Sequence, residues 1–358
     1  MTTERPHATI DDPYAAVREN RSSAIPVLQD LTNHFCALMQ WSVIRAALSG
    51  KSSRHIVDQF MDTVEKETPF RFVIGDEGNA VRNADIILAN HQGPQTDDVG
   101  GVDGECADIA RGTGGTEGLY AHALLPPHTR YVLKNYLVRI PRWTLVKALA
   151  RLALLDWHAV KKELRQLFMA LAFRKTKPII VDRTMEKPAR EVGAPARRNR
   201  AYVDRMREVR QNVAREICRT VHEDGKPVMV YPEGTRSNDG KIQGFVSEFF
   251  QTIVTDYILP RIKEDRPIRI GILAADVLSA FPDGVGRDVK AYNKPITLRG
   301  VEYNPAGVVM ELEERMQRVG DEPLSEKEIK TYGRMLLMDA RWQMANALTE
   351  ILERNEKA

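Results

Sequence analysis

The chain of 358 residues is long enough for one large domain with a smaller accessory region. Its hydrophobic content of 43% and charged content of 28% are typical of a globular enzyme, and a net charge of +3 gives no indication of a nucleic-acid partner. Three cysteines without CxxC spacing favour neither a disulfide scaffold nor a zinc site. We expect no signal peptide and no membrane-spanning helix.

The first part of the chain is predicted to be helical. Residues 1–20 have the composition of a loose polar tail, and apolar side chains then recur at helical spacing over residues 25–49 and 55–66. Because both helical patterns precede the first strand-like run, we assign residues 1–68 to an N-terminal tail and helical subdomain. Residues 69–358 then form the main domain.

From residue 70 onward, short apolar runs alternate with helical patterns. The runs predict strands at 70–74, 86–89, 129–133, 179–181, 228–231 and 268–273. The helical patterns predict helices at 143–154, 159–173, 199–223 and 246–262. This alternation favours an α/β fold with a mixed, mostly parallel central sheet that is flanked by helices.

The chain closes with a predicted helix. Its start carries a capping-box pattern, in which Ser325 is followed three positions later by Glu328. Large apolar side chains recur along this helix every three or four residues. They predict an inner face that consists of Met335, Met338, Trp342, Ala345, Leu348 and Leu352.

Reactive side chains follow the predicted strand at 86–89. His91 comes first, and Asp97 and Asp98 lie a few positions further on. A neutral imidazole can take the proton from an alcohol whose oxygen attacks a carbonyl, and a carboxylate at the other ring nitrogen holds the tautomer. His91 is therefore predicted to be a general base, with Asp97 or Asp98 reaching back to it across a turn.

A second motif, Tyr-Pro-Glu-Gly-Thr-Arg-Ser at 231–237, follows the predicted strand at 228–231. Arg236 offers a forked donor, Gly234 allows close backbone approach, and Glu233 can hold a hydroxyl or position the arginine. Arg183 follows the apolar run at 179–181 in the same manner. Two arginines that both follow short apolar runs predict a shared anionic ligand.

Together these motifs resemble the glycerolipid acyltransferase superfamily, over about residues 70–280. The superfamily includes glycerol-3-phosphate and 1-acylglycerol-3-phosphate acyltransferases, and its fourth block is a short apolar strand, for which residues 268–274 are the candidate. The resemblance implies that the catalytic pair is His91 and Asp97. It also implies a set of residues that bind the acceptor, namely Arg183, Glu233, Gly234, Thr235 and Arg236.

One residue departs from the superfamily pattern. Four residues separate the histidine from the aspartate in the family, which would place the acid at Thr96. A turn that is one residue longer brings in Asp97, and Asp98 is the alternative. A third reading is a degenerate site, in an acyltransferase-like protein that binds lipid or acyl-carrier protein without catalysis.

The resemblance implies an enzyme of phospholipid biosynthesis that transfers a fatty acyl group. The acyl donor would be a fatty acyl thioester of acyl-carrier protein or of coenzyme A, and the acceptor would be glycerol 3-phosphate. A lysophospholipid is the alternative acceptor, and a thioester hydrolase that uses His91 is a rival function. Because a thioester is already activated, we expect no metal and no bound cofactor.

The expected location is cytoplasmic, with peripheral binding to the inner membrane face as an alternative. Residues 136–155 mix arginine and lysine with tryptophan and leucine. This composition suits either a core helix with a basic outer face or a helix that lies in a bilayer interface.

Overall fold

The structure is a computed structural model of the whole chain. It describes residues 53–67, 71–91, 124–126, 128–134, 177–181, 200–234, 242, 244–276 and 295–357. The helices expected at 25–49, 143–154 and 159–173 lie outside these residues, and the basic segment 136–155 does so too. The proposed domain boundary at residue 68 stays a prediction.

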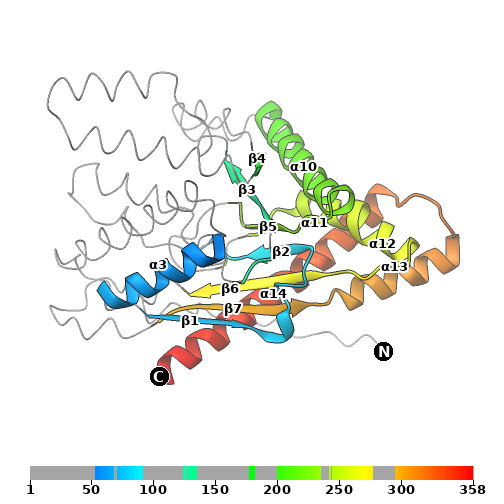
Figure 1. Cartoon of the computed structure of the whole chain (residues 1–358). Coiled ribbons are helices and arrows are strands. Elements are labelled where there is room, and N and C mark those ends of the chain that lie inside the picture. The colour runs from blue at the N-terminus through cyan, green and yellow to red at the C-terminus, as the bar shows by residue number, and fades with distance from the viewer. Residues whose placement is uncertain are drawn as a thin grey trace, which may run out of the picture.

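The described residues form a seven-stranded sheet in the order β1-β7-β6-β2-β5-β3-β4 (Figure 1). All neighbouring strands are parallel except β6 and β7, which are antiparallel. The expected mixed, mostly parallel sheet is therefore confirmed. The strands are β1 (Phe72–Asp76), β2 (Ile86–Ala89), β3 (Arg130–Lys134), β4 (Ile179–Val181), β5 (Val228–Val230), β6 (Ile270–Asp276) and β7 (Ile296–Tyr303).

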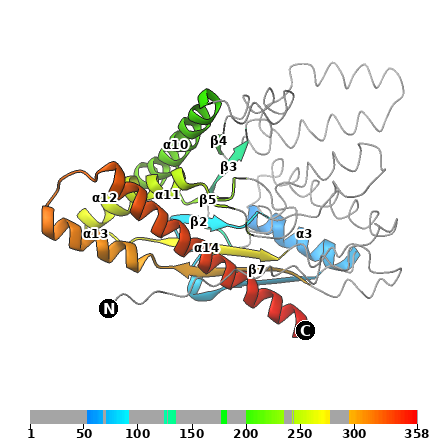
Figure 2. The ribbon, with the colours of Figure 1, turned by 180° about the vertical axis from the view of Figure 1, so that it is seen from behind.

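Helices cover both faces of this sheet, and Figures 1 and 2 show them from opposite sides. One face packs against α10, α11, η3, α13 and α14, and the opposite face packs against α3. In the part of the chain that is described, no helix is long and apolar enough to cross a bilayer. The helices are α3 (Ser53–Glu67), α10 (Arg200–Glu223), α11 (Ser247–Ile253), η3 (Val254–Ile258), α12 (Leu259–Lys263), α13 (Ala306–Val319) and α14 (Glu326–Lys357).

The central strand β2 is buried on both faces. Ile86 and Leu88 pack with α10, α11 and α14, whereas Ile87 and Ala89 pack with the α3 side of the core. All four side chains are at most 2% exposed. Such a strand reads as a continuous apolar run, which is why the sequence predicts its bounds correctly.

Strand β7 is not predicted by the sequence, because Arg299, Gly300 and Glu302 interrupt its apolar pattern. In the structure, Arg299 is only 9% exposed. Its guanidinium donates to the carboxylate of Glu77, with 2.7 Å between Nη2 and Oε1, and it also pairs with Glu350 of α14. Two carboxylates therefore neutralise a charge that would otherwise be costly to bury.

The helix predicted at 246–262 forms, but it is interrupted by the π-helical segment η3. Pro260 follows this segment and has no N–H to donate, and its ring would clash with the carbonyl four residues earlier. A widened turn before the proline removes that conflict. Tyr257 of this segment points inward, where its hydroxyl donates to Asp85 at 3.1 Å and accepts from the Arg269 N–H at 3.0 Å.

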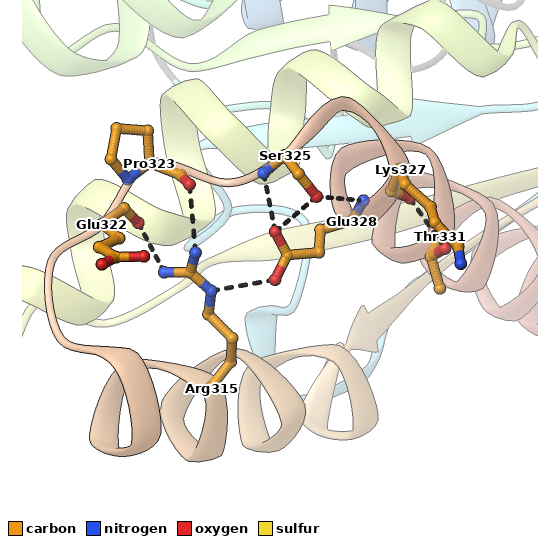
Figure 3. A network of polar contacts seen from close by, with 7 residues as sticks. All are labelled: Arg315, Glu322, Pro323, Ser325, Lys327, Glu328 and Thr331. Atoms are coloured by element: carbon orange, nitrogen blue, oxygen red, sulfur yellow. Dashed lines mark hydrogen bonds and ion pairs between the residues drawn. The ribbon is translucent and has the colours of Figure 1, made fainter.

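The predicted capping box begins α14 (Figure 3). The Glu328 N–H donates to Ser325 Oγ at 3.3 Å, and the Ser325 N–H donates to the Glu328 carboxylate at 2.7 Å. Arg315 of α13 donates from Nε to the same carboxylate at 3.1 Å, and from its terminal nitrogens to the carbonyls of Glu322 and Pro323. One arginine thus joins the end of α13 to the start of α14.

The predicted inner face of α14 is only partly correct. Ala345, Leu348 and Leu352 are buried as expected, but Met338 is 46% exposed and Trp342 is 45% exposed. The pattern of large side chains misleads because small residues make part of the true contact and let the helix approach the sheet. The buried side chains that the pattern does not predict are Tyr332, Leu336, Ala340, Met344, Ala347, Ile351 and Asn355.

The capping box should make stability depend on pH. The side-chain and backbone hydrogen bonds from Ser325, together with the bond from Arg315, lower the pKa of Glu328 to about 2. An unfolded glutamate has a pKa of about 4.3. A depressed pKa contributes stability above the unfolded value, and this contribution is lost as the pH falls from about 4.3 towards 2.

We therefore expect Glu328→Gln to lower the urea midpoint relative to wild type at pH 6. The difference should shrink progressively below about pH 4.3, because the carboxylate of the unfolded chain then binds a proton while that of the folded chain stays ionised until about pH 2. Urea unfolding followed by circular dichroism at several pH values measures it. A difference that stays constant down to pH 2 would contradict the assignment.

Candidate functional site

Three neighbouring parallel strands, β2, β5 and β6, end at one edge of the sheet (Figure 1). Strand β2 lies between the other two, and its Leu88 pairs with Val230 of β5 and with Ile272 of β6. The residues that follow β2 and β5 therefore emerge side by side. Enzymes with open α/β sheets bind their ligands at this carboxyl edge, and the candidate site lies there.

Asn90 prolongs the pairing of β2 with β6 through its side chain. Its Nδ2 donates to the Ala275 carbonyl at 2.9 Å, and the Ala275 N–H donates to its Oδ1 at 2.7 Å. A primary amide carries a donor and an acceptor, as a peptide group does, so it satisfies both backbone groups of Ala275. The side chain is 1% exposed. The backbone just before His91 is thereby fixed to β6.

The segment after β5 folds as a β-turn from Tyr231 to Gly234. The Gly234 N–H closes the turn on the Tyr231 carbonyl at 3.0 Å. Such a turn favours proline at its second position and glycine at its fourth, as found here. Gly234 has a φ of +67°, which residues other than glycine rarely adopt. The Pro232 carbonyl accepts from the Val246 N–H at 2.9 Å, which ties the turn to the start of α11.

Glu233 joins this turn to the histidine motif. Its Oε1 accepts a hydrogen bond from the backbone N–H of His91 at 2.9 Å, across 142 positions of sequence. Both residues are buried, with Glu233 5% exposed and His91 8% exposed. Because the acceptor is a carboxylate, the bond is charge-assisted and stronger than one between neutral groups. The two motifs therefore form one site.

The imidazole of His91 stacks on the ring of Tyr231. The ring centroids are 4.3 Å apart and the planes are inclined by 24°. Tyr231 packs on the α3 side of the core, next to buried residues of β2 and β5. The stacking limits rotation of the imidazole, so the side chain is held in place as well as the backbone.

The structure brings His91, Glu233 and Gly234 together, as the sequence predicts. Asp97, Asp98, Arg183, Thr235 and Arg236 lie outside the described residues. Strand β4 ends two residues before Arg183 and is joined through the parallel strand β3 to β5, so its carboxyl end points to the same edge of the sheet. The roles expected of these residues stay predictions.

Two residues of the site have structural roles that the sequence did not predict. Asn90 binds β6, and Tyr231 supports the imidazole. Their sequence signals are weak, since an amide before a histidine and an aromatic residue at a strand end are both common.

Among the described residues, no group of three histidine, cysteine or acidic side chains could hold a metal ion.

Residues 155–262 match the model of a family described as Acyltransferase. No curated protein matches the sequence. Among solved structures, the chain is similar to PlsC from Thermotoga maritima, described as a 1-acyl-sn-glycerophosphate (LPA) acyltransferase. The identity is 14%, the TM-score is 0.37, and the match covers 88% of this chain and 97% of that chain.

The matched stretch 155–262 contains Arg183 and the whole turn after β5. This stretch is similar to the acyltransferase family, as the motifs predict. The histidine motif lies outside the matched stretch, and the bond between Glu233 and His91 connects the two.

The Asn90 side chain should contribute measurably to folding. We expect Asn90→Ala to lower the free energy of unfolding by about 2–4 kcal/mol, because it leaves a buried N–H and a buried carbonyl of Ala275 without partners. Urea unfolding should show a lower midpoint with an unchanged slope.

The matched control is Asn212→Ala, since Asn212 lies exposed on α10. It should change the unfolding free energy by less than about 0.5 kcal/mol. Equal effects of the two substitutions would show that the Asn90 hydrogen bonds do not hold β2 to β6.

Proposed function

We propose that this chain is a glycerolipid acyltransferase, with glycerol 3-phosphate as its acceptor. The donor is acyl-carrier protein or a coenzyme A thioester, and the product enters phospholipid biosynthesis. The proposal rests mainly on the contact between the His91 motif and the Glu233 turn at one sheet edge. The acyltransferase-family match of residues 155–262 supports it.

In the proposed reaction, His91 takes the proton from the acceptor hydroxyl as its oxygen attacks the thioester carbonyl carbon. The carbon–sulfur bond then breaks, and the imidazolium returns the proton to the leaving sulfur. The new ester and a free thiol are the products. Asp97, or Asp98 in its place, orients the imidazole and stabilises its protonated form. No metal or bound cofactor enters these steps.

The acceptor phosphate is proposed to lie between Arg183 and Arg236. A phosphate that leaves water needs more than one cationic partner, and arginine can bind it with two parallel hydrogen bonds. Gly234 and Thr235 adjoin Arg236 in the chain and complete this side of the site. A lysophospholipid carries the same phosphate, so it is the alternative acceptor. We place the enzyme in the cytoplasm, at or near the inner membrane surface.

The first test is an acyl-transfer assay with purified protein, labelled acyl-carrier protein or acyl-coenzyme A, and a panel of acceptors. We expect product with glycerol 3-phosphate and a kcat about 100- to 10,000-fold lower for His91→Ala, because the general base is lost. The variant should stay folded, with an unfolding midpoint only slightly below that of wild type, because it loses the stacking of the imidazole on Tyr231.

Each other outcome of the panel has a distinct meaning. Product formed only with a lysophospholipid would show that the acceptor is a lysophospholipid, and the proposed acyl transfer would stand. Free fatty acid formed without any acceptor would indicate a hydrolase. Activity of His91→Ala within threefold of wild type would remove His91 from the mechanism.

The phosphate site can be tested separately through Arg236. We expect Arg236→Ala to raise the acceptor KM by about 10- to 100-fold, because a charge-assisted hydrogen bond contributes about 1.5–3 kcal/mol. The donor KM should change much less. Arg236→Lys should recover part of the loss, since an ammonium cannot form the two-pronged contact.

Glycerol is the control acceptor for this variant. It lacks the phosphate, so it should be a poor acceptor for wild type and should be scarcely affected by Arg236→Ala. If glycerol works as well as glycerol 3-phosphate, the phosphate assignment is wrong.

A further inference from the structure

We propose that Glu233 acts as a positioning residue for His91 and that it does not act as a ligand of the acceptor. This inference rests on the proposed function, because it assigns a task within the same site. The resemblance to acyltransferases implies instead that Glu233 binds the acceptor. The hydrogen bond from the His91 backbone N–H to Glu233 Oε1 is the observation that separates the two roles.

The peptide group between Asn90 and His91 is held from two sides. Its N–H donates to Glu233 Oε1 at 2.9 Å, and the Asn90 side chain is bound to both backbone groups of Ala275. We call these hydrogen bonds ties: the one to Glu233 connects the peptide to the turn after β5, and those of Asn90 connect it to β6. The imidazole therefore sits on a backbone that is fixed to both neighbouring strands.

Glu233 is well placed to serve as such a tie. The β-turn that carries it is closed by the hydrogen bond from Gly234 to Tyr231, and the Pro232 carbonyl is bound by the Val246 N–H at 2.9 Å. The side chain is 5% exposed. A carboxylate that is buried and bonded to a backbone amide is positioned to stabilise the protein's own structure.

The chemical reason to fix this peptide is the geometry of proton transfer. A general base must lie within about 3 Å of the proton that it takes, and a misplacement of about 1 Å can cost about 100-fold in rate. A shift of the His91 backbone moves the imidazole by a similar amount. Losing the tie should therefore lower kcat, whereas losing a ligand of the acceptor should raise the acceptor KM.

Two substitutions of Glu233 separate the effect of side-chain length from the effect of side-chain charge. Glu233→Gln keeps an oxygen at the same distance from the backbone and removes the charge. Glu233→Asp keeps the charge and shortens the side chain by one methylene group, so the carboxylate no longer reaches the His91 N–H. A positioning role predicts that the aspartate is the more damaging, whereas a role that depends on charge predicts the opposite order.

We expect Glu233→Asp to lower kcat by about 100-fold and Glu233→Gln by less than about tenfold, because a neutral hydrogen bond is about half as strong as a charge-assisted one. The KM for glycerol 3-phosphate should stay within about threefold of wild type in both. Glu313→Asp, on the exposed side of α13, is the matched control and should behave as wild type.

A second readout does not depend on activity. Hydrogen exchange of the His91 backbone amide, measured by mass spectrometry of a peptide that covers residues 86–91, should be faster in Glu233→Asp than in wild type. Glu233→Gln should exchange at an intermediate rate. This measurement stands even if wild type transfers no acyl group, so failure of the proposed function and failure of the tie can be told apart.

Two results would overturn the inference. One is a tenfold or larger rise of the glycerol 3-phosphate KM in Glu233→Gln with little loss of kcat, which would make Glu233 an acceptor ligand. The other is equal protection of the His91 amide in all variants, which would show that the hydrogen bond does not hold the peptide.

Discussion

The candidate site depends on one constraint, which is that the backbone polar groups at the carboxyl ends of buried strands must find hydrogen-bond partners. Within the sheet, β2 lies between β5 and β6 and its backbone is paired on both sides. Beyond Ala89, the Asn90 amide and the Glu233 carboxylate take over this task. An unpaired buried N–H or carbonyl costs about 1–3 kcal/mol, so these side chains are required by the fold as well as by the site.

The antiparallel pairing of β7 with β6 extends the sheet away from β2 and β5. It allows β1 to join as a parallel edge strand, but it places the charged residue Arg299 in a nearly buried position. Close packing adds a second requirement, since a Cβ at Gly300 would overlap the carboxylate of Asp76. That carboxylate accepts the Val81 N–H at 2.9 Å, so Gly300 makes room for the turn that leads into β2.

The sequence predicts the elements whose physical cause is local. Strand β2 is buried on both faces and forms a continuous apolar run, so its bounds are predicted correctly. The bounds of β4 are also predicted correctly from its apolar run, although β4 is an edge strand and its Ile180 is 42% exposed. The capping box of α14 is predicted because all of its atoms lie within four residues. Strand β7 and the inner face of α14 are different, because ion pairs from distant elements bury Arg299 and because small side chains decide how closely a helix approaches the sheet.

The same distinction applies to the site. The motifs of His91 and Glu233 are visible in the sequence, and parallel strands predict that they meet at one edge. No sequence pattern shows that a glutamate carboxylate binds the backbone of a histidine that lies 142 positions earlier. The resemblance to a family assigns residues to tasks, whereas the hydrogen-bond geometry indicates which atoms carry them out.

One short turn connects the two halves of the proposed chemistry. Glu233 of this turn holds the backbone of His91, and Arg236, the predicted phosphate ligand, follows three residues later in the chain. The hydrogen bond from the Val246 N–H to the Pro232 carbonyl anchors the same turn to the start of α11, which packs in the core on one face of the sheet. The distance between a base and an acceptor hydroxyl must be held constant to within a fraction of an ångström. The attachment of the His91 backbone to this closed turn therefore limits how far the base can move.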